Sequence, residues 1–313
     1  MIGVDFTGRL GNQLFTYAFL RNVWERQGRR CCIKANFKRC RTGNFEEGFD
    51  NSIRFFHTVP VQEESSDLIL THGTWKQRAI YLYYTACSKL PWIARNDRLM
   101  TRIEQKIEQY GLYFTGAADK ARFPDTLPSG PLFIRGYFQD KNNFENIRPI
   151  LLEELTPTTP PLPSNKNLYE IAARPDSVCV SVRCGDYLSS QYKSDFYVCT
   201  PRYFQKAIAL IRERTDNPTF IFFSNDIAWV KNNIRVPEDV ECYYESGTDP
   251  AWETLRLMYS CHHFIISNST FAWWAQYLGR RSGKIVVSPT HWFANPNWSS
   301  NLIDDSFLQV SDG

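Results

Sequence analysis

Short apolar runs alternate with longer amphipathic segments through the second half of this chain. The runs lie at 178–182 (VCVSV), 219–224 (TFIFFS), 264–267 (FIIS) and 284–288 (KIVVS). Apolar residues recur at helical spacing in the segments 202–214, 252–261 and 271–281. Short apolar runs are typical of buried strands, and their alternation with helices predicts an α/β fold with a doubly wound parallel sheet. Ligands of such sheets bind beyond the carboxyl ends of the strands.

The first half of the chain also opens with a strand and a helix. Residues 2–6 (IGVDF) predict a buried strand, and helical spacing of apolar residues begins at Leu14. The polar turn between them holds Gly8, Arg9, Gly11, Asn12 and Gln13. Its glycines would let a ligand approach the backbone and its carboxamides offer donors and acceptors, although an ordinary strand-to-helix turn has the same composition.

A proline-rich segment marks the predicted domain boundary. Residues 156–167 read TPTTPPLPSNKN, and the four prolines exclude a regular helix and remove sheet donors. A chain of 313 residues is long for a single core, so two domains are expected. We predict a first domain over 1–155, a linker over 156–167 and a second domain over 168–313.

Charge and hydropathy restrict the partners. The net charge of +3 is too small for nucleic-acid binding through bulk electrostatics, so an anionic ligand would need a local site. No apolar run approaches the roughly 18 residues of a membrane span, and the chain opens without a basic and apolar leader. We therefore expect a cytoplasmic protein with at most peripheral membrane association.

Cysteine and aromatic residues allow two further expectations. The nine cysteines are scattered, and the groups around Cys31 and Cys261 lack paired CxxC spacing, so we expect free thiols and no zinc site. Aromatic residues make up 15% of the chain. Five of them are either core residues or flat surfaces that stack on sugars: Trp75, Trp92, Trp292, Phe293 and Trp298.

Polar residues follow the predicted strands of the second half and converge on one edge of the sheet. Ser267, Asn268, Ser269 and Thr270 lie between a strand and a helix, where they are either ordinary N-caps or part of an anion site at the helix start. Arg183 follows another strand, where it either forms a salt bridge or binds phosphate oxygens through its planar fork. Together these residues favour a diphosphate ligand.

Absent motifs narrow the chemistry of that diphosphate site. The chain has neither GxxxxGK[ST] nor GxGxxG, so a P-loop and a dinucleotide fingerprint are excluded. It also lacks DxD, the carboxylate pair that would hold Mg²⁺ or Mn²⁺ on a nucleotide sugar. We therefore expect a site without metal or cofactor, in which arginine and backbone donors offset the charge of the diphosphate.

Five segments in order resemble the motifs of the α-1,2-fucosyltransferase family. They read GRLGNQLFTYA, VSVRCGDY, FIFFSNDIAWVK, LMYSCHHFIISNSTFAWWAQYL and VVSPTHWF, and together they span nearly the whole chain. The resemblance implies a GT-B-like fold of two Rossmann-like domains facing a cleft. It also implies GDP-β-L-fucose as donor, no metal, and inversion to an α-1,2 linkage on a glycan that usually ends in galactose.

The resemblance also implies roles for individual residues. It puts Asn12 and its turn near the fucose and the acceptor. The sequence over 81–111 separately suggests a helical stretch, which would shape an acceptor cleft. Arg183 matches the arginine that holds the diphosphate. Ser269 and Thr270 match the phosphate-facing helix start, which Asn268 and Phe271 flank. Asp226 and Glu253 are the candidate contacts to the guanosine.

Two departures from the family pattern HxRRGD concern the diphosphate: Ser181 stands where His is common, and Cys184 where a second Arg is common. The mechanism implied is a single displacement in which Arg183 and the amides of Ser269 and Thr270 stabilise the leaving group. Asp186 and Asp5 are candidate general bases, although either could be structural. The alternatives are a fucosyltransferase of another linkage and a non-catalytic carbohydrate-binding protein.

Overall fold

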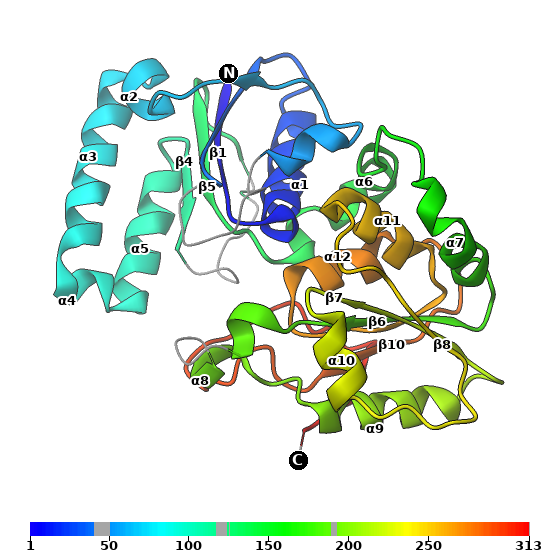
Figure 1. Ribbon diagram of the computed structural model, residues 1–313. Helices are drawn as coiled ribbons and strands as arrows, with labels where there is room; N and C mark the ends of the chain where they lie inside the picture. The colour runs from blue at the N-terminus through cyan, green and yellow to red at the C-terminus, as the bar shows by residue number, and fades with distance from the viewer. Residues whose placement is uncertain (41–50, 117–123, 125, 189–192, 313) are drawn as a thin grey trace. The chain divides into compact units, whose positions relative to one another are not determined.

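The computed structural model describes residues 1–40, 51–116, 124, 126–188 and 193–312 (Figure 1). The chain divides into two compact units, Met1–Glu154 and Leu155–Gly313. Each unit has its own parallel sheet, with helices on both faces. The predicted α/β fold class with two Rossmann-like domains is therefore confirmed.

In the first unit, β1 is the central strand of a five-stranded parallel sheet of order β3-β2-β1-β5-β4. Its strands are β1 (Ile2–Thr7), β2 (Ile33–Arg39), β3 (Gln62–Glu63), β4 (Leu112–Thr115) and β5 (Leu132–Gly136). Because β5 pairs directly with β1, the chain after β1 and the chain after β5 leave the sheet side by side. This edge carries the polar turn that the sequence singles out.

Helices cover both faces of this first sheet (Figure 1). They are α1 (Leu10–Arg26), α2 (Leu68–His72), α3 (Trp75–Lys89), α4 (Pro91–Ala94), α5 (Asp97–Glu108) and α6 (Arg148–Glu154), with short 3-10 turns at Ser52–Phe55, Lys141–Asn143 and Glu145–Ile147. On one face, Phe19 of α1 packs on Tyr113 of β4. On the other, Phe114 of β4 packs with Leu68 and Ile107 from α2 and α5.

The predicted helical stretch over 81–111 is three helices rather than one. Pro91 occupies the first turn of α4. It interrupts the helical hydrogen bonding after α3, because proline has no amide hydrogen to donate. Thr74 begins α3 with a capping box to Gln77, and Asn96 caps α5 by accepting from the Leu99 amide at 3.1 Å. Gly111, with φ of +79°, turns the chain into β4.

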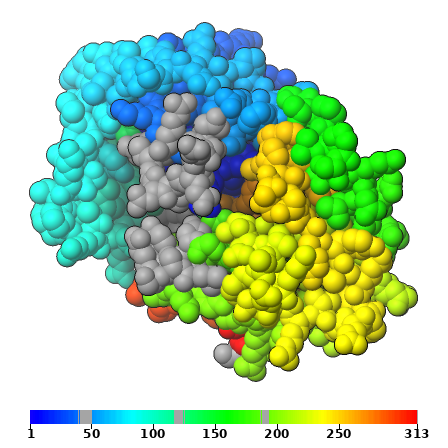
Figure 2. All heavy atoms as spheres, in the orientation of Figure 1, coloured from blue at the N-terminus to red at the C-terminus, as the bar shows by residue number. Residues whose placement is uncertain are grey.

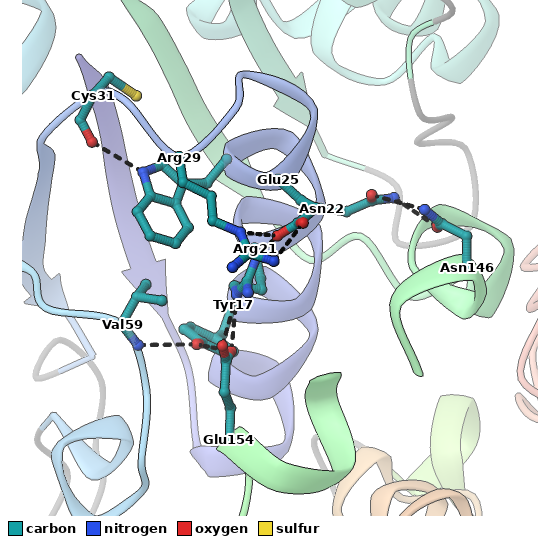
Figure 3. Close-up of polar contacts among 10 residues, drawn as sticks. Tyr17, Arg21, Asn22, Glu25, Arg29, Cys31, Val59, Asn146 and Glu154 are labelled. Carbon is teal, nitrogen blue, oxygen red and sulfur yellow. Dashed lines mark hydrogen bonds and ion pairs between the residues drawn. The ribbon is translucent and has the colours of Figure 1, made fainter. Parts of the chain in front are cut away.

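A polar network fastens α6 to α1 within the first unit (Figure 3). The Tyr17 hydroxyl donates to Oε2 of Glu154 at 2.5 Å, and Nε of Arg21 donates to Oε1 at 2.8 Å. The Val59 amide donates to the Tyr17 oxygen at 3.1 Å. Burial first, and then the charge of Glu154, raise the pKa of Tyr17, so the phenol stays protonated and acts as donor. The last turn of the first unit is thereby fixed to its first helix.

The second unit has a six-stranded parallel sheet of order β11-β10-β9-β6-β7-β8. Its strands are β6 (Ser177–Val182), β7 (Thr219–Ser224), β8 (Cys242–Tyr244), β9 (His263–Ile265), β10 (Val286–Pro289) and β11 (Leu308–Val310). The doubly wound parallel sheet predicted from the apolar runs is confirmed. The order of strands reverses between β6 and β9, which is the topological switch point of this sheet.

Helices lie on both faces of the second sheet, with α9 and α10 on one side and α7, α11 and α12 on the other (Figure 1). Their bounds are α7 (Lys166–Ala172), α8 (Lys193–Phe196), α9 (Pro201–Arg212), α10 (Ile227–Asn233), α11 (Ala251–Ser260) and α12 (Thr270–Leu278), with 3-10 turns at Pro163–Asn165 and Gly185–Leu188. Tyr203 and Phe204 of α9 pack with Val180 and Phe222 of the central strands. These apolar contacts hold the strand ends in place.

The structure packs the predicted linker against α11 within the second unit. Residues 163–165 form a 3-10 turn and Lys166 begins α7. The Leu162 amide and Nδ2 of Asn165 donate to Oε1 of Glu253 at 2.9 and 3.2 Å. The prolines prevent a long helix here, but side-chain bonds order the segment.

Candidate functional site

The candidate site of the second unit lies at the switch point, where β6 and β9 end side by side. Arg183 follows β6 and is half-buried. Ser267 and Asn268 follow β9 and are buried, while Ser269, Thr270 and Phe271 at the start of α12 are partly exposed. The structure therefore brings together the strand-end arginine and the helix start that the sequence predicts for a diphosphate.

A carboxamide from the neighbouring strand end fixes the loop that carries Arg183. The Cys184 amide donates to Oδ1 of Asn225 at 3.1 Å. Gly185 has φ of +57°, and a Cβ there would lie 2.5 Å from Nδ2 of Asn225. This left-handed backbone favours glycine, and a side chain there would also displace the Asn225 carboxamide. Cys184, at the place of a second arginine in the family pattern, is 1% exposed and faces the core, where burial raises the pKa of its thiol.

Tyr187 joins the loop after β6 to the loop after β9. The guanidinium carbon of Arg183 lies 5.6 Å from the centroid of the Tyr187 ring, within cation–π range. The Tyr187 hydroxyl donates to the main-chain oxygen of Asn268 at 3.2 Å. One side chain therefore supports the arginine and braces the segment that leads into α12. Tyr187 was not predicted as a site residue, although it follows Arg183 by four residues.

The start of α12 is open on the side of its amides. Ser269 is the N-cap residue, but its side chain makes no capping hydrogen bond. The Trp273 amide donates to the Ser269 oxygen at 2.9 Å, so the amides of Thr270, Phe271 and Ala272 precede the first bond of the helix. Ordinary side-chain capping, the alternative reading of this segment, is wrong for Ser269. Free amides and the positive end of the helix dipole suit an anion.

Asn268 is a brace rather than a phosphate donor. It is 1% exposed, and its Nδ2 donates to the main-chain oxygens of Phe196 and Trp292, both at 2.8 Å. Both of its amide hydrogens are thereby used, and the remaining Oδ1 can only accept. The prediction that Asn268 binds the donor directly is not supported by this geometry, and we assign it the role of positioning the loops around α8 and after β10.

The two predicted guanosine contacts differ in exposure. Asp226 is exposed at the end of β7, where its Oδ1 accepts from the Trp229 amide at 2.8 Å and caps α10. Glu253 is 0% exposed and pairs with Arg256. Burial alone would raise the pKa of Glu253, but hydrogen bonds from Arg256, the Leu162 amide and Asn165 outweigh it and hold the pKa below its usual value. Glu253 therefore belongs to the scaffold of the second unit.

An aromatic cluster borders the same edge of the second sheet. The ring of Phe196 lies 5.2 Å from that of Tyr187, 5.7 Å from that of Phe293 and 5.6 Å from that of Trp298. Trp298 is 44% exposed, whereas Trp292 is buried. Of the candidate sugar-stacking aromatics in the second unit, Trp292 is thus a core residue and Trp298 offers a surface. Asp186 lies in the turn Gly185–Leu188, but its side chain is outside the described part of the structure.

In the first unit, Asn12 lies in the first turn of α1. The helix begins at Leu10 rather than at Leu14, because the amides of Asn12 and Gln13 both donate to the Arg9 oxygen. Oδ1 of Asn12 accepts from Nε2 of Gln139 at 3.1 Å, and a Cβ on Gly8 would lie 2.6 Å from Nδ2 of Asn12. Asn12 is partly exposed at the edge where β1 and β5 end. Gln139, which follows β5, was not predicted.

Two other predicted residues of the first unit are structural. Asp5 is buried in β1 and accepts from Nε of Arg135, its partner in β5, at 2.5 Å. Arg135 is in turn held over the rings of Tyr81 and Phe114. Asp5 is therefore a paired carboxylate rather than a general base. Gln13 is buried between the Gly8 oxygen and the Ser52 amide.

Among the described residues, no three His, Cys, Asp or Glu side chains gather as a metal site would require. All nine cysteines are free thiols. Within the described ranges, no helix combines the length and apolar character needed to cross a bilayer.

Comparison with known proteins assigns the family. The family model for glycosyl transferase family 11 matches residues 100–308. An α-1,2-colitosyltransferase of Escherichia coli is 27% identical over 94% of this chain and 92% of its own length. The O-antigen biosynthesis glycosyltransferase WbnK of Escherichia coli is 32% identical over 56% of this chain, and the match spans only 59% of WbnK. Galactoside α-(1,2)-fucosyltransferase 2 of Pongo pygmaeus is 25% identical over 88% of this chain and 68% of its own length.

Solved structures match this chain at low sequence identity. The α-1,6-fucosyltransferase NodZ, in crystals soaked with GDP-fucose, matches 88% of this chain and 92% of its own with a TM-score of 0.46 and 13% identity. The Escherichia coli heptosyltransferase WaaC matches 99% of this chain and 92% of its own with a TM-score of 0.43 and 8% identity. Because the family model covers well over half of the chain, this protein belongs to glycosyl transferase family 11.

Proposed function

We propose that this glycosyltransferase moves L-fucose from GDP-β-L-fucose to the 2-hydroxyl of a terminal galactose, with inversion at the anomeric carbon. The observation that carries the proposal is that Arg183, after β6, and the open start of α12, after β9, follow neighbouring strands at the switch point. The similarity to fucosyl- and colitosyltransferases supports the donor class and the linkage.

The proposed reaction is a single displacement. The acceptor oxygen attacks the anomeric carbon from the face opposite GDP, the bond to the diphosphate breaks, and GDP leaves with the bonding electrons. Arg183 and the amides of Thr270 and Phe271 offset the charge that develops on the leaving diphosphate, which stabilises the transition state more than the ground state. Asp226, exposed at the end of β7, is the remaining candidate contact to guanosine.

The proton of the acceptor hydroxyl requires a base. Asp186 is our candidate, since its turn begins two residues after Arg183 and Asp5 is paired with Arg135. We propose that Asn12, with Gln139 holding its carboxamide, contributes from the first unit to orienting the sugar or the acceptor. No metal is needed in this mechanism, because fixed donors take the role that a cation has elsewhere.

A donor and acceptor screen tests the proposal. GDP release would be measured with GDP-fucose and with GDP-colitose, against lactose, N-acetyllactosamine and galactosyl-N-acetylgalactosamine, with and without EDTA. We expect GDP-fucose to be used, the product linkage to be α-1,2 by NMR, and EDTA to have no effect. Preference for GDP-colitose would assign the donor of the colitosyltransferase relative instead. Loss of turnover in EDTA with rescue by Mn²⁺ would overturn the metal-free site, and sugar binding without turnover would indicate a carbohydrate-binding protein.

A further inference from the structure

One surface of the first unit exposes large apolar side chains. Of the eight such side chains that the described residues expose, seven lie between Leu70 and Tyr110. Trp75 is 75% exposed, Trp92 67%, Tyr83 60% and Leu82 57%. The core reading of Trp75 and Trp92 is therefore wrong. We call this surface of α2, α3 and α4 the α3 surface, defined by Leu70, Trp75, Leu82, Tyr83, Leu90 and Trp92.

The opposite side of α3 is packed, so the exposed side cannot turn inward. Gln77 donates to the oxygens of Tyr110 and Pro131 at 2.8 and 2.7 Å. Tyr81 donates to Oδ2 of Asp67 at 2.7 Å, and the ring of Tyr84 lies 5.0 Å from that of Phe114. Helical periodicity then directs Trp75, Leu82 and Tyr83, with the exposed Ala79 and Ala86, to the outer side.

Basic residues border this apolar stripe. Lys76 lies along one side of it and Arg78 and Lys89 along the other, and all three are exposed. Residues 68–110 contain seven Lys and Arg against three Asp and Glu, a net charge of +4, compared with +3 for the whole chain. Two of the three acidic side chains turn toward the sheet, since Glu104 is buried and Glu108 is half-buried. The exposed border of the α3 surface, formed by Lys76, Arg78 and Lys89, is therefore positively charged.

We propose that the α3 surface docks this glycosyltransferase on an anionic lipid bilayer. An amphipathic helix with Trp, Tyr and Leu on one side and Lys and Arg at its borders has the composition of elements that lie in the membrane interface. Cations next to the rings match acidic headgroups, while the rings and leucines reach the acyl boundary. The inference does not depend on the donor or on the acceptor.

Charge argues against the other occupants. A symmetric dimer through the α3 surface would bring two positively charged borders together, at an electrostatic cost. A polyanion such as single-stranded nucleic acid would match the cations and stack on the tryptophans, but it would leave Leu70, Leu82 and Leu90 without an apolar partner. A bilayer surface satisfies both features. Figure 1 shows α2, α3 and α4 in cyan on the outer side of the first unit, and Figure 2 shows cyan atoms at its surface.

Vesicle sedimentation tests the proposal with two variants of the α3 surface. Trp75→Ser/Trp92→Ser removes the two most exposed rings. Lys76→Glu/Arg78→Glu/Lys89→Glu reverses the sign of the charge at the border. The matched controls are Trp298→Ser and Lys166→Glu/Arg202→Glu/Arg214→Glu, at exposed positions of the second unit. Vesicles would be pure phosphatidylcholine or a mixture with phosphatidylglycerol. Circular dichroism and melting temperature would verify folding of every variant.

We expect the wild type to bind phosphatidylglycerol vesicles at low salt and to be released at about 0.5 M salt. Each α3 variant should lower the partition coefficient about tenfold or more, whereas each control should retain most of the binding. Absence of vesicle binding, or an equal loss in the controls, would overturn the proposal. So would dimerisation in solution that Trp75→Ser/Trp92→Ser abolishes, or tight binding to an oligonucleotide without binding to vesicles.

Discussion

The hydroxyl of Tyr187 donates a hydrogen bond to the main-chain oxygen of Asn268, with 3.2 Å between the two oxygens. This bond joins the loop after β6 to the segment that leads into α12, and the same tyrosine ring supports the guanidinium of Arg183. The two halves of the proposed diphosphate site are therefore held at a fixed separation before any ligand binds. Such preorganisation lowers the cost of stabilising charge in a transition state.

Removal of the Tyr187 hydroxyl tests this brace. Tyr187→Phe keeps the ring beside Arg183 and loses one hydrogen bond. The loss should cost about 1 kcal/mol of transition-state stabilisation, so kcat/KM should fall about fivefold. Tyr187→Ala removes the ring as well and should cost more. The measurement is initial rate at subsaturating GDP-fucose, with the melting temperature as control for folding. Equal rates for the wild type and both variants would show that Tyr187 does not position the site.

Arg183 should be the most sensitive position. Arg183→Ala removes a charged donor beside the diphosphate and should cost about 3 kcal/mol or more, about a hundredfold in rate. Arg183→Lys keeps the charge but loses the planar fork, so it should also be impaired. Because Cys184 is buried where the family pattern has a second arginine, no adjacent side chain replaces the lost cation. A near-normal rate of Arg183→Ala, or its unfolding, would make Arg183 a structural residue.

The second sheet could be predicted from the sequence because its central strands are short, continuous apolar runs. β6 is buried throughout and β7 up to its last residue, Ser224, and both match the predicted ranges within one residue. β8 and β11 were missed, since each has only three residues and is partly exposed at a sheet edge. A strand that is not buried on both faces of its sheet lacks a continuous apolar run, so the sequence predicts it poorly.

Side-chain roles that depend on distant partners could not be predicted. Asn12 bonds to Gln139, which is 127 residues away, and β5 inserts beside β1 only in the folded sheet. Glu253 resembled a ligand contact at a helix start, but its carboxylate meets the segment 162–165. Arg256, three positions after Glu253, was a local signal of an ion pair within the helix. The exposure of Trp75 likewise depends on which side of α3 packs on the sheet.

Asn12→Ala should separate transfer from nucleotide binding. Asn12 belongs to the first unit, whereas the proposed diphosphate site belongs to the second. The variant should therefore lower the transfer rate while GDP still raises the melting temperature as in the wild type, because a ligand stabilises only the state that binds it. Gln139→Leu should give a milder loss through disorder of the Asn12 carboxamide. A lost response to GDP in Asn12→Ala would instead put Asn12 at the nucleotide.

Glu253→Gln should lower stability more than nucleotide binding. The change leaves Arg256 buried without its carboxylate, which costs about 3 kcal/mol or more in a buried pair. Since the folded pKa of Glu253 lies below its unfolded value, the wild type loses this stability as the pH falls through the folded pKa. Thermal melts with and without GDP provide the measurement. An unchanged melting temperature together with weakened GDP binding would instead support Glu253 as a contact to the guanosine.

The pH dependence of stability should carry a signature of Glu108 at the end of α5. Burial first, and then the nearby charge of Glu104, raise the pKa of Glu108 from 4.5 to about 7. Between these two values the folded state binds more protons than the unfolded state, so the free energy of unfolding falls as the pH rises. Below pH 4.5 the carboxyl is neutral in both states, and above about 7 it is charged in both.

Glu108→Gln, which stays neutral, should melt like the wild type near pH 4.5, and its melting temperature should rise above the wild type's as the pH approaches 8. Glu238→Gln, at an exposed position of the second unit, is the matched control for loss of one carboxylate. A difference between Glu108→Gln and the wild type that stays constant from pH 4.5 to 8 would show that Glu108 titrates alike in the folded and unfolded chain.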